Sequence, residues 1–161
     1  MGVSHTFEIT QRLGALAAIY DVRKGGEAEP SMTVNGTFAT ATPKFDLVDN
    51  KDNKALGSLK GNVVKTRFQI LSDKGNELAT LNFAAVSLSK SLTMAIAGKG
   101  YHAKAGLLGG TFDCADNDGN VVLSITKEEG LRDKFKVEIK GEIPSEVALL
   151  AAVAIHSRFY E

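Results

Sequence analysis

The sequence has little of what a secreted protein usually carries. It contains one cysteine, Cys114, among 161 residues, so an internal disulfide is excluded. Disulfides are typical of oxidising compartments, and the first residues show no basic segment followed by an apolar run, as a signal peptide would. We therefore expect a protein of the reducing cytoplasm.

An excess of charge of one sign is also missing. Nineteen lysine and arginine residues balance nineteen aspartate and glutamate residues. A net charge of zero gives no overall field that would attract nucleic acid or an anionic membrane. We expect no nucleic-acid partner, and any contact with an anionic surface has to come from a local basic patch.

No hydrophobic run is long enough to cross a membrane. Residues 147–155 form nine consecutive apolar residues, whereas a membrane-spanning helix needs about twenty. Pro144, Ser145 and Glu146 are typical of a helix start, and Arg158 suits a helix end, so the pattern predicts a helix over 145–159. Because this helix has no polar face, the rest of the chain must surround it.

The chain before this helix repeats a short pattern. Residues 45–53 and 112–120 share Phe, Asp, Asp, Asn and Asn at the same offsets. Each copy has an alternating strand, a turn rich in Asp, Asn and Gly, and a second strand, which is the pattern of a β-hairpin. Solenoids and propellers also repeat, but only a closed barrel both pairs all its strands and encloses an apolar helix. Copies begin at Tyr20, Phe45, Phe68, Leu92, Phe112 and Phe135.

The N-terminal part is less regular. Residues 6–11 alternate like a strand. Residues 13–19 suit a short helix or a strand that enters Tyr20, and we favour the strand.

The order of these elements resembles one family. The hairpins are followed by segments 101–108, 121–127 and 133–139 and then by the alanine-rich helix. This order, from about residue 6 to the end, resembles the LURP-one-related proteins, which share a superfamily with phospholipid scramblases and the tubby C-terminal domain. The resemblance implies a mostly β fold, one tubby-like domain over 1–161, in which a closed antiparallel barrel of twelve strands surrounds the C-terminal helix.

The resemblance also implies a class of function. Members of the family are not established enzymes, tubby domains bind phosphoinositides through a basic pocket, and scramblases act on phospholipid membranes. This chain departs from the family at His156, where the final helix often carries an acidic residue. It also lacks the calcium segment and the cysteine-rich palmitoylation stretch of scramblases, so the resemblance does not extend to scrambling.

Two glycine motifs suggest cofactors and fail on context. Residues 98–103 read G-x-G-x-x-A, but a dinucleotide-binding motif must open a long helix, and glycines interrupt this segment within ten residues. Residues 113–119 suggest a calcium loop, but Ile125 would stand where the twelfth position needs a carboxylate. We interpret both as hairpin turns and expect no cofactor and no metal.

The sequence shows no pattern of residues that is typical of a catalytic site. Cys114 shares a strand face with Phe112, which favours core packing, and no serine lies in a nucleophile elbow. His5, His102 and His156 are too scattered to indicate a shared metal site. The sequence therefore predicts a protein that is not an enzyme.

Basic residues give the one indication of a ligand. Strand alternation over 64–68 places Val64, Thr66 and Phe68 on one face and Lys65 and Arg67 on the other. In the same way, Lys134 and Lys136 point outward on either side of Phe135. If strands 64–68 and 134–137 lie close together, the four basic residues form one patch that could bind a phosphate or an anionic lipid. The patch consists of Lys65, Arg67, Lys134 and Lys136.

These observations favour a non-catalytic binding or scaffolding module that recognises anionic phospholipid headgroups as a peripheral protein at a membrane surface. Two alternatives stay open, namely an enzyme or small-molecule carrier with its site at a barrel end, and a barrel that binds a protein partner. Residues 1–6 also match the N-myristoylation pattern M-G-x-x-x-[ST], with Gly2 as the acceptor.

Overall fold

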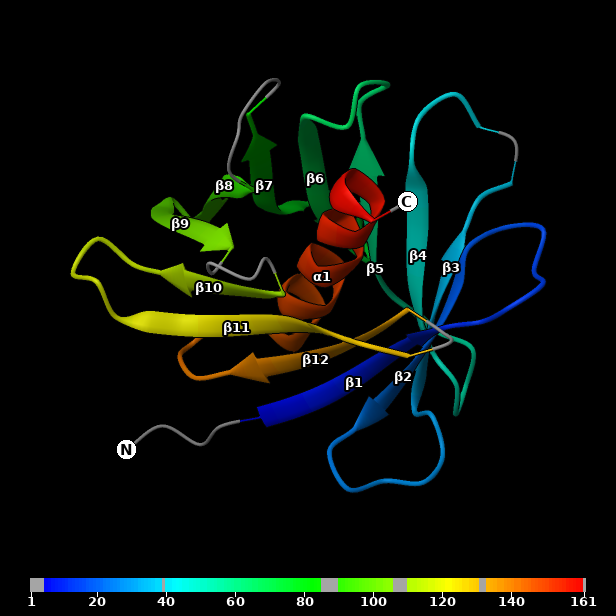
Figure 1. The fold of residues 1–161 in the computed structure, drawn as a ribbon. Coiled ribbons are helices and arrows are strands. Elements are labelled where there is room, and N and C mark those ends of the chain that lie inside the picture. Colours follow the sequence, from blue (N-terminus) through cyan, green and yellow to red (C-terminus); the bar gives the residue numbers. More distant parts are fainter. Residues whose placement is uncertain (1–4, 39, 85–89, 106–109, 131–132, 161) are drawn as a thin grey trace.

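The computed structural model describes residues 5–38, 40–84, 90–105, 110–130 and 133–160 (Figure 1). The N-myristoylation pattern at Gly2 lies outside these residues. Within the described residues, one helix, α1 (Ser145–Phe159), follows twelve strands, as the family resemblance implied. The strands are β1 (His5–Gln11), β2 (Ile19–Lys24), β3 (Met32–Gly36), β4 (Lys44–Asp49), β5 (Ala55–Gly61), β6 (Arg67–Ser72), β7 (Glu77–Phe83), β8 (Ser91–Ile96), β9 (Lys99–Ala105), β10 (Thr111–Ala115), β11 (Val121–Glu128) and β12 (Lys134–Ile139).

The strands form one closed antiparallel barrel. Each strand pairs with the next in sequence, and β1 pairs with β12 to close the sheet. Each predicted repeat starts at the second residue of an even-numbered strand. The first five copies are hairpins, as expected, whereas the sixth is β12, which is followed by α1 and pairs with β1. The first side chain of every copy is buried in the barrel interior, namely Tyr20, Phe45, Phe68, Leu92, Phe112 and Phe135.

Helix α1 fills the barrel. Figure 1 shows it inside the ring of strands, and residues 147–157 are buried on every side. Leu149 and Leu150 have no exposed surface. The apolar inner faces of the strands supply the complete cover that this helix requires, and the helix in turn occupies the space that a ligand would need inside a barrel.

The two ends of the barrel differ. The connections 12–18, 37–43 and 62–66 lie at the end where α1 finishes, which we call the helix-exit end. The turns 25–31, 50–54, 73–76 and 116–120 lie at the other end, which we call the helix-entry end. This arrangement follows from antiparallel pairing, because successive connections alternate between the two ends.

The helix-entry turns have the chemistry that the repeats predicted. Gly75, Gly98 and Gly119 have φ between 79° and 83°, a left-handed conformation that glycine adopts without strain. The carboxylate of Asp116 accepts hydrogen bonds from the amides of Asp118 and Asn120. These bonds, that of Asn120 first, hold the pKa of Asp116 below its usual value. Each of the segments 98–103 and 113–119 thus consists of a hairpin turn and an adjoining piece of strand, and neither is a cofactor-binding loop.

The predicted strand over 13–19 is wrong. Residues 12–18 form the β1–β2 connection, and β2 begins at Ile19. Gly14 has φ +76°, which interrupts an extended strand, and Leu16 is 88 % exposed. The apolar composition of this segment therefore does not reflect burial in the core.

The predicted alternation over 64–68 is also wrong before Arg67. The side-chain carbonyl of Asn62 accepts hydrogen bonds from the amides of Thr66 and Arg67, which closes a turn over 62–66. Lys65 has φ +57° within this turn, and Val64 is 64 % exposed instead of facing the core. Phe68 is buried and Arg67 is exposed, so the pattern holds only from the start of β6.

His156 joins the end of α1 to the barrel wall. Its Nδ1 lies 2.7 Å from the hydroxyl of Tyr20, and its Nε2 lies 2.7 Å from Oδ2 of Asp133. An ionised carboxylate only accepts, so Nε2 donates to Asp133. The hydrogen bond from His156 is the main cause that lowers the pKa of Asp133, with a further contribution from the charge of Lys127. A polar residue is therefore tolerated at the buried helix end because both ring nitrogens have partners.

Replacing Leu150 by aspartate is expected to prevent soluble folding. Leu150 has no exposed surface, and a carboxylate buried without a partner costs several kcal/mol, which is comparable to the whole stability of about 5–15 kcal/mol of a domain. Soluble yield and thermal unfolding measure the effect. The matched control is Leu16→Asp at a largely exposed position, which is expected to fold. A Leu150→Asp protein with an unchanged melting temperature would show that the helix is not enclosed.

Acidification is expected to destabilise the natural chain more than an Asp133→Asn variant. The folded pKa of Asp133 is lowered, so its contribution to stability is complete above the unfolded value of about 3.9 and is lost as pH falls through the lower folded value. Urea unfolding at neutral pH and at decreasing acidic pH measures this. The stability gap between the two proteins should shrink on acidification, and Asp73→Asn, in an exposed turn, is the control for the removal of a carboxyl group. A constant gap would contradict the contribution of Asp133.

Candidate anion-binding face

The structure does not bring the four predicted basic residues to one patch. Arg67 begins β6 and Lys65 precedes it, while Lys134 and Lys136 lie on β12. Strands β6 and β12 are six strands apart in either direction around the barrel. Strands with this separation in a closed barrel of twelve lie on opposite walls, so the expected proximity of the two pairs is wrong, although the outward direction of Lys136 and Arg67 holds.

The lysines of β12 lie beside an acidic residue. Nζ of Lys134 is 3.2 Å from a carboxylate oxygen of Glu8, and Lys136 lies directly opposite Glu8 in the β1–β12 register. The negative charge of Glu8 offsets part of the positive charge on this wall. Whether Lys134 and Lys136 contact an anion stays a prediction.

Arg67 has basic neighbours that the sequence patterns did not indicate. Lys60 on β5 lines one surface groove together with Arg67. Lys44, the first residue of β4, lies directly opposite Lys60 in the β4–β5 register. All three side chains are exposed on the outer wall of β4, β5 and β6 at the helix-exit end.

The charge of these three residues is not compensated locally. Within the described part of the chain, none of Lys44, Lys60 and Arg67 forms an ion pair. The carboxylate closest to the Lys44–Lys60 pair on β4 and β5 is Asp46. It lies opposite Ser58, in the next outward-facing pair of residues away from the helix-exit end. Like charges that face each other across a sheet are unfavourable unless a counter-ion binds them.

Lys65 extends this group toward the barrel axis. Its Nζ donates a hydrogen bond of 2.9 Å to the backbone carbonyl of Ser157, in the last turn of α1. The carbonyls of a last turn lack partners within the helix and carry partial negative charge, so the ammonium group stabilises the helix end. We call Lys44, Lys60, Lys65 and Arg67 the basic cluster.

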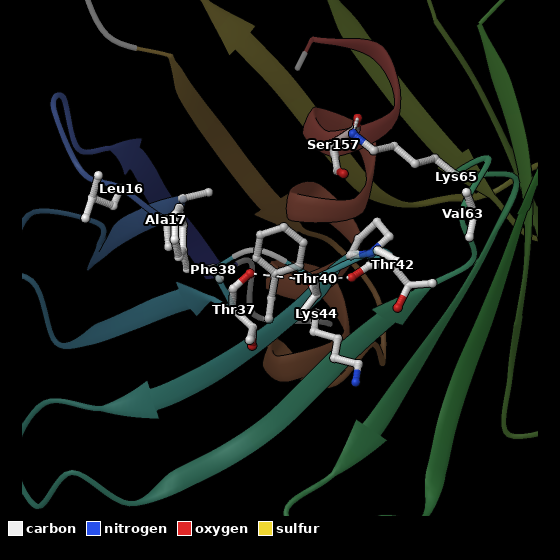
Figure 2. A pocket seen from close by; sticks show the side chains of 15 residues that line it. Leu16, Ala17, Thr37, Phe38, Thr40, Thr42, Lys44, Val63, Lys65 and Ser157 are labelled. Atoms are coloured by element: carbon white, nitrogen blue, oxygen red, sulfur yellow. Dashed lines mark hydrogen bonds between the residues drawn. The ribbon is translucent and has the colours of Figure 1, made fainter.

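A hollow of about 250 Å³ lies beside the basic cluster, between the connections of the helix-exit end (Figure 2). Lys44 and Lys65 line it together with Phe38 and Thr40. The hydroxyl of Thr40 donates a hydrogen bond of 2.7 Å to the carbonyl of Thr42, which fixes one wall. The face thus combines positive charge with both polar and apolar side chains.

The buried polar groups do not form a catalytic site. Tyr20 and His156 are at most 1 % exposed, so a substrate cannot reach their chain of hydrogen bonds to Asp133. Cys114 is buried as predicted, and burial raises the pKa of its thiol to about 12, far from that of a nucleophilic thiolate. The described residues contain no group of three or more His, Cys, Asp or Glu side chains placed to hold a metal ion.

Lys44 and Lys60 are the members of the cluster that the sequence patterns missed. Both follow or precede a hairpin connection by one or two residues, where a lone lysine is unremarkable. Only their pairing across the β4–β5 hairpin indicates that Lys44 and Lys60 belong together. This pairing is hard to predict, because a bulge between Leu47 and Val48 shifts the register by one residue. Counting outward from the turn would have placed Lys44 opposite buried Leu59.

A comparison with protein families agrees with the fold. The model of the LURP-one-related family matches residues 5–156, which include all twelve strands and most of α1. Proteins with this tubby-like barrel are generally not enzymes. No curated protein matches the sequence. In the described residues, no helix is both long and apolar enough to cross a bilayer. The match covers most of the chain, and the chain therefore belongs to the LURP-one-related family.

Proposed function

We propose that this protein is a non-catalytic module that binds anionic phospholipid headgroups at a membrane surface through its basic cluster. The observation that carries the proposal is the exposed group Lys44, Lys60 and Arg67, which has no paired carboxylate among the described residues. Membership in a family of tubby-like barrels supports it, because a lipid-binding role is what that membership suggests.

The expected attachment is weak and sensitive to salt. A lysine or arginine near an anionic membrane contributes about 1 kcal/mol, and this attraction decreases over a Debye length of about 8 Å at physiological salt. Several such residues on one wall act together even though the net charge of the chain is zero. The local cluster therefore supplies the attraction that the overall charge does not.

The interior of the barrel does not favour a small-molecule carrier. Helix α1 fills the space that a lipocalin-like barrel would offer, and residues 147–157 of the helix are buried. The hollow beside Lys44 and Lys65, at about 250 Å³, is smaller than the about 300–1,000 Å³ of most small-molecule sites. Surface binding agrees better with this geometry.

A triple variant, Lys44→Glu, Lys60→Glu and Arg67→Glu, is expected to lose binding to phosphatidylserine vesicles. The loss of about 1 kcal/mol per basic residue lowers the partition coefficient by about a hundredfold, before the added repulsion is counted. Sedimentation with vesicles at low and physiological salt measures it. The natural chain should bind at low salt and bind less at physiological salt.

The matched control is Lys51→Glu, Lys54→Glu and Lys74→Glu, which changes the net charge equally with exposed residues of the helix-entry turns. This control is expected to bind like the natural chain, and a Lys134→Glu, Lys136→Glu variant measures whether the lysines of β12 contribute to binding. Equal losses in the two triple variants, which change the net charge equally, would show that net charge, and not the basic cluster, determines binding. No binding of the natural chain at low salt would refute the proposal and favour a protein partner.

A further inference from the structure

The exposed apolar side chains of this protein lie almost entirely at one end. Among the described residues, six large hydrophobic side chains are exposed, and five of them belong to the helix-exit connections. The sixth, Val121, is 37 % exposed and lies near the helix-entry end. Single exposed apolar residues are ordinary, but their collection at one end indicates an interaction surface. The five are Leu13 (65 %), Leu16 (88 %), Phe38 (64 %), Val63 (68 %) and Val64 (64 %).

The three connections that carry these residues are neighbours in the barrel. They join β1 to β2, β3 to β4 and β5 to β6, which are consecutive strands of the sheet. Figure 2 shows Leu16, Phe38 and Val63 around the same hollow. We call these five side chains the apolar rim.

The charge at the apolar rim suits an anionic surface. The connections 12–18, 37–43 and 62–66 contain Arg12 and Lys65 and no acidic residue. Two acidic residues lie close to the 12–18 connection, and both are paired. Asp21 on β2 forms an ion pair with Arg12. Asp133, whose backbone carbonyl accepts a hydrogen bond from the amide of Gln11, contacts His156 and Lys127 through its carboxylate. The helix-entry turns, in contrast, carry many carboxylates, including Glu27, Glu29, Asp52, Asp73 and Asp118.

The order of the groups along the barrel axis matches the order of layers in a membrane. The apolar rim lies in the connections, while Lys44 and Arg67 are the first residues of β4 and β6 and so come just behind it. In a bilayer, the boundary of the acyl chains lies beneath the anionic headgroups. Apolar side chains that enter this boundary reach about 5–10 Å into it. The basic residues behind them would then lie at headgroup level.

We infer that the apolar rim inserts into the acyl-chain boundary of an anionic bilayer and holds the barrel with its helix-exit end toward the membrane. This inference rests on the proposed function, because the basic cluster provides the initial attraction. Insertion adds a fixed orientation of the barrel on the membrane and an apolar contribution to binding that salt does not remove. The occupant of the surface is the bilayer itself, and the hollow next to Phe38 is part of the inserted face.

The chain contains no tryptophan, so a single tryptophan reports its own surroundings. A Phe38→Trp variant places it in the apolar rim, and Val121→Trp places the control near the helix-entry end. Both are mixed with vesicles of phosphatidylcholine and phosphatidylserine, with and without brominated acyl chains. Fluorescence of Phe38→Trp should shift to shorter wavelength and be quenched by bromine, whereas fluorescence of Val121→Trp should do neither.

Sedimentation of the same samples separates the proposed headgroup binding from the inferred insertion. If Phe38→Trp binds the vesicles without a shift or quenching, the inference is refuted and the proposed headgroup binding stands. If neither variant binds, the proposed function fails and insertion fails with it. A blue shift that depends on protein concentration in the absence of vesicles would show that a second copy of the chain covers the rim, which overturns the inference.

A second variant tests the same surface without tryptophan. Leu16→Ser, Phe38→Ser and Val63→Ser change three largely exposed side chains, so the fold should persist. This variant is expected to keep binding at low salt through the basic cluster and to lose the binding that the natural chain retains at high salt. Unchanged binding at high salt would contradict insertion.

Discussion

The burial of one wholly apolar helix inside the barrel is the constraint on which this structure depends. Residues 147–155 offer no polar face, so the sheet around them must close and present apolar side chains along its whole inner surface. The six even-numbered strands meet this need by each placing one large buried side chain near its start, such as Tyr20 or Phe68. Closure also removes the exposed strand edges that would allow aggregation.

The same constraint places function on the outside. A filled barrel has no interior site, and the hydrogen bonds of His156 to Tyr20 and Asp133 connect the helix end to the wall instead of to a substrate. What remains is the outer wall and the two ends. The helix-entry end consists largely of polar hairpin turns, whereas the helix-exit end has connections with apolar tips and a basic cluster behind them. This asymmetry supports a membrane-facing role for the helix-exit end.

Much of the fold could be predicted from the sequence because its determinants are local. The nine-residue apolar run, the helix-starting residues before it and the repeated Asp and Gly turns each act within a few residues, and they gave α1 and the hairpins. Closure by β1 against β12, and the count of twelve strands, needed the order of all elements and the family resemblance.

The candidate site was harder to predict, for physical reasons. Alternation suggested an outward Lys65, but Asn62 binds the amides of Thr66 and Arg67 and turns the chain there. Residues 13–19 are apolar yet lie mostly in a connection, so composition alone could not separate a core strand from an exposed apolar segment. The pairing of Lys44 with Lys60 depends on a bulge, and a register error of one residue moves every side chain to the other face.

Hydrogen exchange of the full natural chain, measured with and without phosphatidylserine vesicles, tests the central claim most directly. The claim is that the helix-exit end of a filled barrel is the binding surface. Amides of the connections 12–18, 37–43 and 62–66 should exchange more slowly when vesicles are present, while the turns 25–31, 50–54 and 73–76 keep their rates. Protection of the helix-entry turns, or a change spread evenly over both ends, would contradict the account.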